Sequence, residues 1–312
     1  FLEVPRFSTG YAALHQTIGF MPETHMLKPF ADRYAAMRAL VEVVLAYTVE
    51  HGATIQALRR AARQAAASQR TWPVLWKPDY SRPASFRFKG YAAVQRPSQL
   101  GNYLRLAYDR NQPWERDIAW FNRCVVDLEV ATPRSYLIPQ SWREVINRLQ
   151  WNDVVLERLA EDQVLSGQVY QIDDVVSRPG PYEGHMFHDG VTLHSVDATV
   201  KARAGDVLVH LDQPRARYAV ETLEPQAHDS FFRWGFFNSI LEKKEAFSDY
   251  VFEDTAQEML EQEPALREAF ARWQAENPDK LSDQQAVLSF IFATGQRHAE
   301  PEWRRYPVLR VI

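Results

Sequence analysis

The chain of 312 residues is 46% hydrophobic and carries a formal net charge of −4 at pH 7. This length and apolar content suit two domains with hydrophobic cores, and the absence of a basic patch argues against a nucleic-acid partner. The single cysteine, Cys124, excludes an intrachain disulfide and a cysteine-rich zinc site. No apolar run reaches the roughly 20 residues that a transmembrane helix needs.

The first residues, Phe1 to Arg6, have neither the charged n-region nor the apolar h-region of a signal peptide. The chain also lacks an initiator methionine, and we interpret Phe1 as a position inside a longer natural chain. Residues 3–11 mix proline, serine, threonine and glycine, which predicts a loop entering a helical or extended segment.

A short apolar run from Ile18 ends at a proline and a carboxylate, Pro22 and Glu23. Proline cannot donate to a sheet ladder, so a strand should end there. Glu23 is then expected at the carboxyl end of a buried strand, where α/β enzymes place their chemistry. After Pro29, apolar residues recur every three or four positions, which predicts an amphipathic helix that ends near Gly52 as its C-cap.

A second helix is predicted from Thr54 to about residue 65, with a boundary over residues 66–70. Alternating apolar and polar residues then predict many short strands, which favour a sandwich or a barrel-like domain. The predicted strands are 71–76, 85–89, 125–130, 135–139, 153–159, 167–176, 191–202 and 206–211, with a helix at 141–150. Helices are predicted again at 229–241, 253–261, 264–276 and 282–292, before an extended end at 303–312. Some of the nine tryptophans, such as Trp72 and Trp76, could stack on sugars or peptides, but packing in a β-rich core is the simpler interpretation.

Three short runs, Gly10–Leu14, Pro22–His25 and Leu27–Pro29, together resemble the end of a bacterial zinc metallocarboxypeptidase domain of the carboxypeptidase A type. The resemblance extends into the accessory region of a bacterial subgroup. The segments that carry this second part are Tyr136–Pro139, Pro181–Gly184, Asp212–Pro214, Leu223–Pro225 and Trp234–Asn238.

The resemblance implies that Glu23 is the general base and acid that works on a zinc-bound water. A glutamate in an ordinary salt bridge at a strand end is the alternative. The resemblance also implies that residues 3–11 help to line the pocket for the substrate's terminal side chain. Ser8, Thr9 and Tyr11 are therefore candidate substrate-binding residues, and an ordinary surface loop is the alternative there.

The zinc ligands of that family, a paired His and Glu and a later His, lie upstream of the catalytic glutamate. A catalytic zinc needs about three protein ligands, yet His15 is the sole histidine before Glu23 and has no His-x-x-Glu partner. We therefore expect the zinc ligands upstream of Phe1 and no turnover by this chain alone. His185, His188, His194 and His210 are a second candidate metal site, but their spacing fits no metal motif, and solvent-exposed loop histidines are the favoured interpretation.

The resulting prediction is an α/β chain in two parts. Residues 1–70 form the C-terminal segment of a carboxypeptidase-like mixed-sheet catalytic domain, and residues 71–312 form an accessory domain that is β-rich to about residue 225 and then helical. The intact protein is predicted to be a zinc-dependent hydrolase that acts on the C-terminal bond of a peptide or protein. The alternative is a non-catalytic module that binds a peptide, a glycan or a partner protein. The sequence specifies neither the oligomeric state nor whether the protein is exported.

Overall fold

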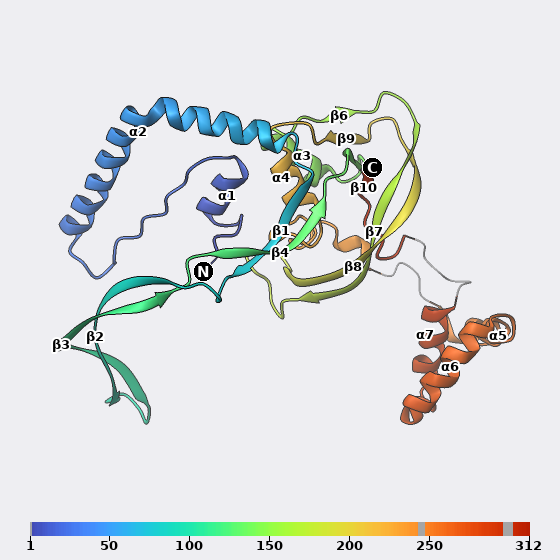
Figure 1. Cartoon of the computed structure of the whole chain (residues 1–312). Helices are drawn as coiled ribbons and strands as arrows, with labels where there is room; N and C mark the ends of the chain where they lie inside the picture. Colours follow the sequence, from blue (N-terminus) through green and yellow to red (C-terminus); the bar gives the residue numbers. More distant parts are fainter. Residues whose placement is uncertain (1, 243–246, 296–301) are drawn as a thin grey trace. The chain divides into compact units, whose positions relative to one another are not determined.

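The computed structural model describes residues 2–242, 247–295 and 302–312 and has a mixed α/β fold (Figure 1). The chain forms two compact units, each built from several segments. The first comprises Phe1–Thr132, Trp151–Val155 and Leu211–Ser230, and the second comprises Pro133–Gln150, Leu156–His210 and Phe231–Ile312. The predicted boundary near residue 70, between a catalytic segment and an accessory region, stays a prediction.

The first unit combines three helices with two strand pairs. Its elements are α1 (Ser8–Leu14), α2 (Phe30–Ala66), β1 (Thr71–Pro78), β2 (Ala84–Pro97), β3 (Leu104–Trp120), β4 (Cys124–Ala131) and α4 (Ala216–Leu223). β1 pairs with β4 and β2 with β3, both antiparallel. In Figure 1 the β2–β3 pair continues from the β1–β4 pair, so the four strands form one long two-stranded ribbon. The predicted strands at 71–76 and 125–130 are confirmed, whereas β3 was not predicted.

The structure has one helix, α2, where the sequence predicted two. Gly52 lies inside α2 and Thr54 is not an N-cap, so both predictions are wrong. A glycine inside a helix costs only about 1 kcal/mol relative to alanine, and starting a second helix is costly, so one continuous helix is favoured. Within α2, which the structure describes in full, only Ala66 is buried.

The predicted strand before Glu23 is not formed. Residues 17–25 have no regular secondary structure, and the side chains of Ile18 and Phe20 are 63% and 66% exposed. A strand gains its hydrogen bonds from a neighbouring strand, and no strand of the described residues pairs with this segment. The apolar run therefore lies outside any sheet and is exposed.

The second unit is organised around an antiparallel six-stranded sheet with the order β6-β9-β5-β10-β7-β8. Its strands are β5 (Ser135–Ile138), β6 (Glu157–Arg158), β7 (Gln163–Ser177), β8 (His188–Ala202), β9 (Val207–His210) and β10 (Leu309–Val311), and α3 (Arg143–Trp151) follows β5. Leu137, Val169 and Leu309 lie in the core over this sheet. The edge strands β6 and β8 do not pair in the described residues, so the sheet is open, and the barrel-like alternative is wrong.

The helical tail is confirmed in part. Three helices, α5 (Asp249–Gln262), α6 (Pro264–Glu276) and α7 (Gln284–Thr294), pack on one another around a core that includes Phe252, Leu266 and Ile291 (Figure 1). The predicted helix at 229–241 is wrong, because these residues form turns and the short 3-10 helix Asn238–Ile240. Gly235, with φ of 79°, takes a left-handed conformation that an α-helix does not contain. Across the described ranges, no helix has both the length and the apolar composition to cross a bilayer.

Candidate functional site

Arginine side chains hold the segment that leads to Glu23. Arg217 Nη1 donates to the Ala13 carbonyl at 3.0 Å, and Arg59 Nε donates to the Gln16 carbonyl at 3.0 Å. Arg215 Nη1 donates to His15 Nδ1 at 2.8 Å. These contacts connect the end of α1 to α2 and α4, so residues 13–17 have a defined position in the first unit.

His15 is partly buried beside a cation. Burial, and then the charge of Arg215, lower the pKa of the His15 imidazole below its ordinary value. A neutral imidazole can accept the hydrogen bond from Arg215, whereas an imidazolium cannot. The neutral form is therefore the one that fits this contact.

Glu23 lies on the exposed segment between α1 and α2. A turn follows it, in which His25 Nδ1 accepts from the backbone N–H of Leu27 at 3.2 Å and the His25 carbonyl accepts from Lys28 at 3.0 Å. The carboxyl is thus accessible to solvent but lacks the buried strand on which the sequence placed it.

Ser8, Thr9 and Tyr11 all lie on α1. Ser8 is exposed, Thr9 Oγ1 donates to Glu3 Oε2 at 2.7 Å, and the Tyr11 hydroxyl donates to Asn152 Oδ1. Among the described contacts, no hydrogen bond or ion pair joins Glu23 to these three residues. Their role in substrate binding stays a prediction.

The described residues do not fit a zinc site, because no three histidine, cysteine, aspartate or glutamate side chains among them gather around one point. The histidines of the second candidate metal site contact different partners instead. His194 contacts Asp173 at 2.8 Å, and His210 contacts Glu157 at 2.6 Å.

His188 contradicts the interpretation as a solvent-exposed loop histidine, because it begins β8 and is 3% exposed. Its Nδ1 lies 2.8 Å from Ser177 Oγ, and its Nε2 lies 2.7 Å from Asn238 Oδ1. Since Asn238 Oδ1 can only accept, Nε2 carries the proton and Nδ1 accepts from the serine. Both ring nitrogens are therefore satisfied in a buried structural network.

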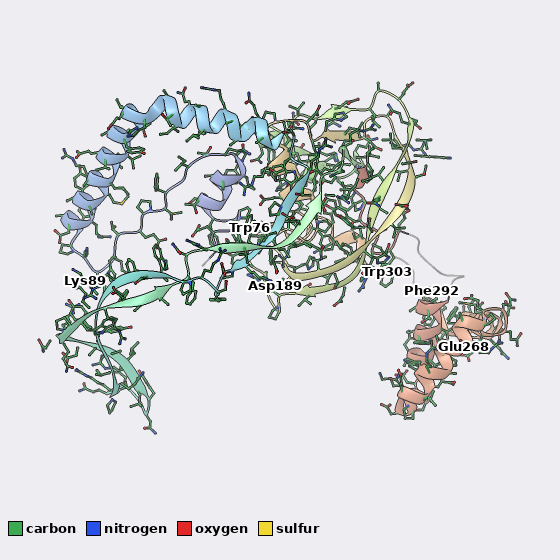
Figure 2. All side chains as sticks on the ribbon, viewed as in Figure 1. Trp76, Lys89, Asp189, Glu268, Phe292 and Trp303 are labelled. Atoms are coloured by element: carbon green, nitrogen blue, oxygen red, sulfur yellow. The ribbon has the colours of Figure 1, made fainter. Side chains whose placement is uncertain are left out.

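A cavity of 340 Å³ in the first unit was not predicted from the sequence. It lies between the C-terminal end of α2, the strand β1 and the helix α4, and Trp76, labelled in Figure 2, belongs to its wall. The Glu221 carboxylate accepts from Arg217 Nε at 2.7 Å inside this cavity. Burial raises the pKa of the Glu221 carboxyl, although the charge of Arg217 opposes the shift. Trp72 and Trp76 of β1 were the sequence signal that could have indicated this cavity. The helix α4, which forms another part of its wall, was not predicted.

Comparison with known proteins finds similarity over one third of the chain. Carboxypeptidase 2 of Trichophyton tonsurans and Carboxypeptidase 2 of Trichophyton equinum are each 32% identical to it over 103 residues. Carboxypeptidase 2 of Trichophyton rubrum is 31% identical over the same length. The match covers 33% of this chain and 19% of each relative.

No family model and no solved structure matches the chain. The bacterial subgroup and the accessory region stay predictions. One third of the chain has a carboxypeptidase-like relationship.

Proposed function

We propose that this chain is the C-terminal portion of a zinc-dependent metallocarboxypeptidase, in which Glu23 is the general base and acid. The intact enzyme hydrolyses the C-terminal bond of peptides or proteins. The observation that carries this proposal is the similarity to fungal proteins named Carboxypeptidase 2. The motif around Glu23, with Thr24 and His25 before Leu27–Pro29, supports the same assignment.

The exposed apolar surface around Glu23 also supports the proposal. Phe20, before Glu23 in the sequence, is 66% exposed, and Met26 and Leu27, after it, are 79% and 81% exposed. The exposure continues along α2 through Phe30, Tyr34, Val41 and Leu45. Contiguous apolar surface of this kind marks a place where other polypeptide packs. Under the proposal, the upstream part of the catalytic domain covers it and gives residues 18–22 a neighbouring strand.

Zinc would be held by residues upstream of Phe1, since the described residues offer no ligand set. This chain contributes the carboxylate. During attack on the peptide carbonyl, the Glu23 carboxylate takes a proton from water and later passes it to the leaving amine. Ser8, Thr9 and Tyr11 on α1 remain the proposed lining of the pocket for the terminal side chain.

The test replaces Glu23 by Gln in the full-length natural protein. Gln keeps the size and polarity but cannot act as a base, so release of the C-terminal amino acid from a peptide should fall by about 10²–10⁴-fold. Zinc content, measured by elemental analysis, should be unchanged because Glu23 is not a ligand. Glu50→Gln, at an exposed position of α2, is the matched control and should keep full activity.

Unchanged turnover in Glu23→Gln would remove this residue from the mechanism. The coding sequence upstream of Phe1 gives an independent test, because it should encode a His-x-x-Glu pair and a further His. If these ligands are missing from the natural gene, the non-catalytic binding module is the correct function.

A further inference from the structure

The two edge strands of the six-stranded sheet differ in length. β6 has two residues, whereas β8 has fifteen and pairs with β7 on one side (Figure 1). From Leu193 to Ala202 this pairing has no register shift, and the strand contains no proline. Backbone N–H and C=O groups along such an edge are a template for another strand, and folded proteins usually shorten, bend or cover it. Since no strand of the described residues pairs with the outer side of β8, that side is open to a further strand.

The exposure of the β8 side chains agrees with an open outer side. Successive residues of a strand point to opposite faces of the sheet, so a strand that is packed on one face buries every second residue. In β8 the four consecutive residues His194–Asp197 are exposed. Val196 is 42% exposed, although Val169, opposite it in β7, is 5% exposed. The apolar face of the sheet therefore ends at β8 with part of its surface uncovered.

The side chains of β8 form two rows near the C-terminal end of the strand. Ala198 and Val200 pack on the core over the sheet, and Lys201 points to the opposite face because successive side chains alternate. Asp197 lies on the same face as Lys201, with Thr199 midway between them. The apolar row and the two charges therefore both centre on Thr199. The apolar row is Val196, Ala198, Val200 and Ala202, and the polar row is Ser195, Asp197, Thr199 and Lys201.

We propose that β8 pairs with β8 of a second copy of this chain, antiparallel about a two-fold axis at Thr199. Asp197 of each copy then lies opposite Lys201 of the other copy, which adds an ion pair on either side of the axis. Thr199 lies opposite its own copy. Opposite charges and threonine pairs that face each other across antiparallel strands stabilise the pairing.

The apolar row is complementary to itself in the same register. Val196 of one copy lies opposite Ala202 of the other, and Ala198 lies opposite Val200, so the apolar face continues across the axis. A two-fold contact requires one surface to match its own copy, and both rows of β8 meet this condition. A second copy is therefore the partner that the sequence of β8 fits.

Other registers lose the ion pairs. An axis at Asp197 or at Lys201 places like charges opposite each other, which is unfavourable. Lys201 is the only lysine or arginine of β8, and Arg203, just after the strand, already contacts Asp162 at 2.7 Å. The register with its axis at Thr199 is therefore favoured. This pairing does not depend on the proposed hydrolase activity.

The first test measures the dissociation constant of the dimer by sedimentation equilibrium, with the full-length natural protein. The unmodified protein should dimerise. Lys201→Glu places a carboxylate opposite each Asp197, so the dissociation constant should rise by about tenfold. Asp197→Lys should have a similar effect, and the double variant Asp197→Lys/Lys201→Glu should restore the dimer because it exchanges the two charges. Glu268→Lys, at an exposed position of α6, is the matched control and should leave the dissociation constant unchanged.

Four results of this test would overturn the proposal. They are a monomeric unmodified protein, a folded single variant with an unchanged dissociation constant, a double variant that dimerises no more tightly than the single variants, and an equal loss in Glu268→Lys. Circular dichroism checks the fold of each variant. If a charge variant does not fold, the cross-linking test below decides.

The second test checks the register in the 312-residue chain, with its one cysteine, Cys124, replaced by Ser. Residues opposite each other in antiparallel strands have Cα atoms about 4.5–5.5 Å apart, which a disulfide can span. Thr199→Cys should therefore give a cross-linked dimer on mild oxidation. Ser195→Cys, on the same face of β8, is the control; its two copies lie about 27 Å apart in this register and should stay unlinked. Equal cross-linking of the two variants, or none in a folded Thr199→Cys variant, would contradict the pairing.

Discussion

At the scale of single residues, the first unit depends on charged groups that reach across long sequence separations. Arg6 donates to Asp229 through its backbone N–H and through Nε, both at 2.8 Å, and so ties the start of α1 to the segment after α4. Arg215 reaches His15 in the same way. Such pairs join residues about 200 positions apart, so no local pattern in the sequence indicates them.

The His15 contact predicts a pH dependence. The pKa of His15 is lowered in the folded protein, so the unfolded chain binds more protons as the pH falls below about 6.5, the ordinary value. The contribution of neutral His15 to the free energy of unfolding is therefore present at neutral pH, and it should be lost as the pH falls through the pKa that His15 has in the folded protein. His15→Gln keeps an acceptor for Arg215 but does not titrate, so its melting temperature should fall less between pH 7.5 and pH 5.0. His51→Gln, at a histidine that contacts Glu50 in α2, is the control and should behave like the unmodified chain. An equal fall in His15→Gln would contradict the prediction.

At the scale of elements, the spacing of apolar residues correctly predicted those strands and helices that bury one face along their length. The strands β7 and β8 and the helices α5, α6 and α7 follow from such patterns. β3 was missed because its interior contains charged residues and Pro113 and because most of it is exposed. The predicted strand before Glu23 was wrong for the opposite reason: its pattern is apolar, but no strand of the described residues pairs with it. The role of Glu23 stays a prediction from the sequence, whereas the cavity beside β1 depends on long-range packing that no local pattern encodes.

Two glycines test this distinction between local propensity and packing. In α2, nothing lies within 4 Å of a Cβ added at Gly52, so Gly52→Ala should stabilise the chain by about 0.5–1 kcal/mol. In β7, a Cβ at Gly167 would lie 2.1 Å from the Arg310 carbonyl oxygen, so Gly167→Ala must displace β10. A cost of about 1–3 kcal/mol is expected for such overpacking. Urea unfolding measures both changes, and shifts of the same sign in the two variants would refute this account.

At the scale of the whole molecule, the segment that holds α5, α6 and α7 begins and ends at one place in the second unit. The backbone N–H of Arg304 donates to the Ile240 carbonyl at 2.8 Å, and Trp303 Nε1 donates to the Leu241 carbonyl at 3.4 Å. Between these points lie α5, α6 and α7, which have a hydrophobic core of their own. This arrangement is that of an inserted module, and it explains why a helical tail is followed by β10, a strand of the main sheet.

Replacing residues 242–302 by a short Gly-Ser linker should therefore leave the rest of the chain folded. The linker closes ends that already lie next to each other, so its closure costs little entropy. The shortened chain should keep a cooperative thermal transition within a few degrees of the parent, and residues 247–295 alone should give a helical circular dichroism spectrum. As a control, removing β10 by ending the chain at Val308 should abolish that transition, since β10 lies between β5 and β7 in the sheet. A linker variant that unfolds as the β10 truncation does would show that the helices are an integral part of the second unit.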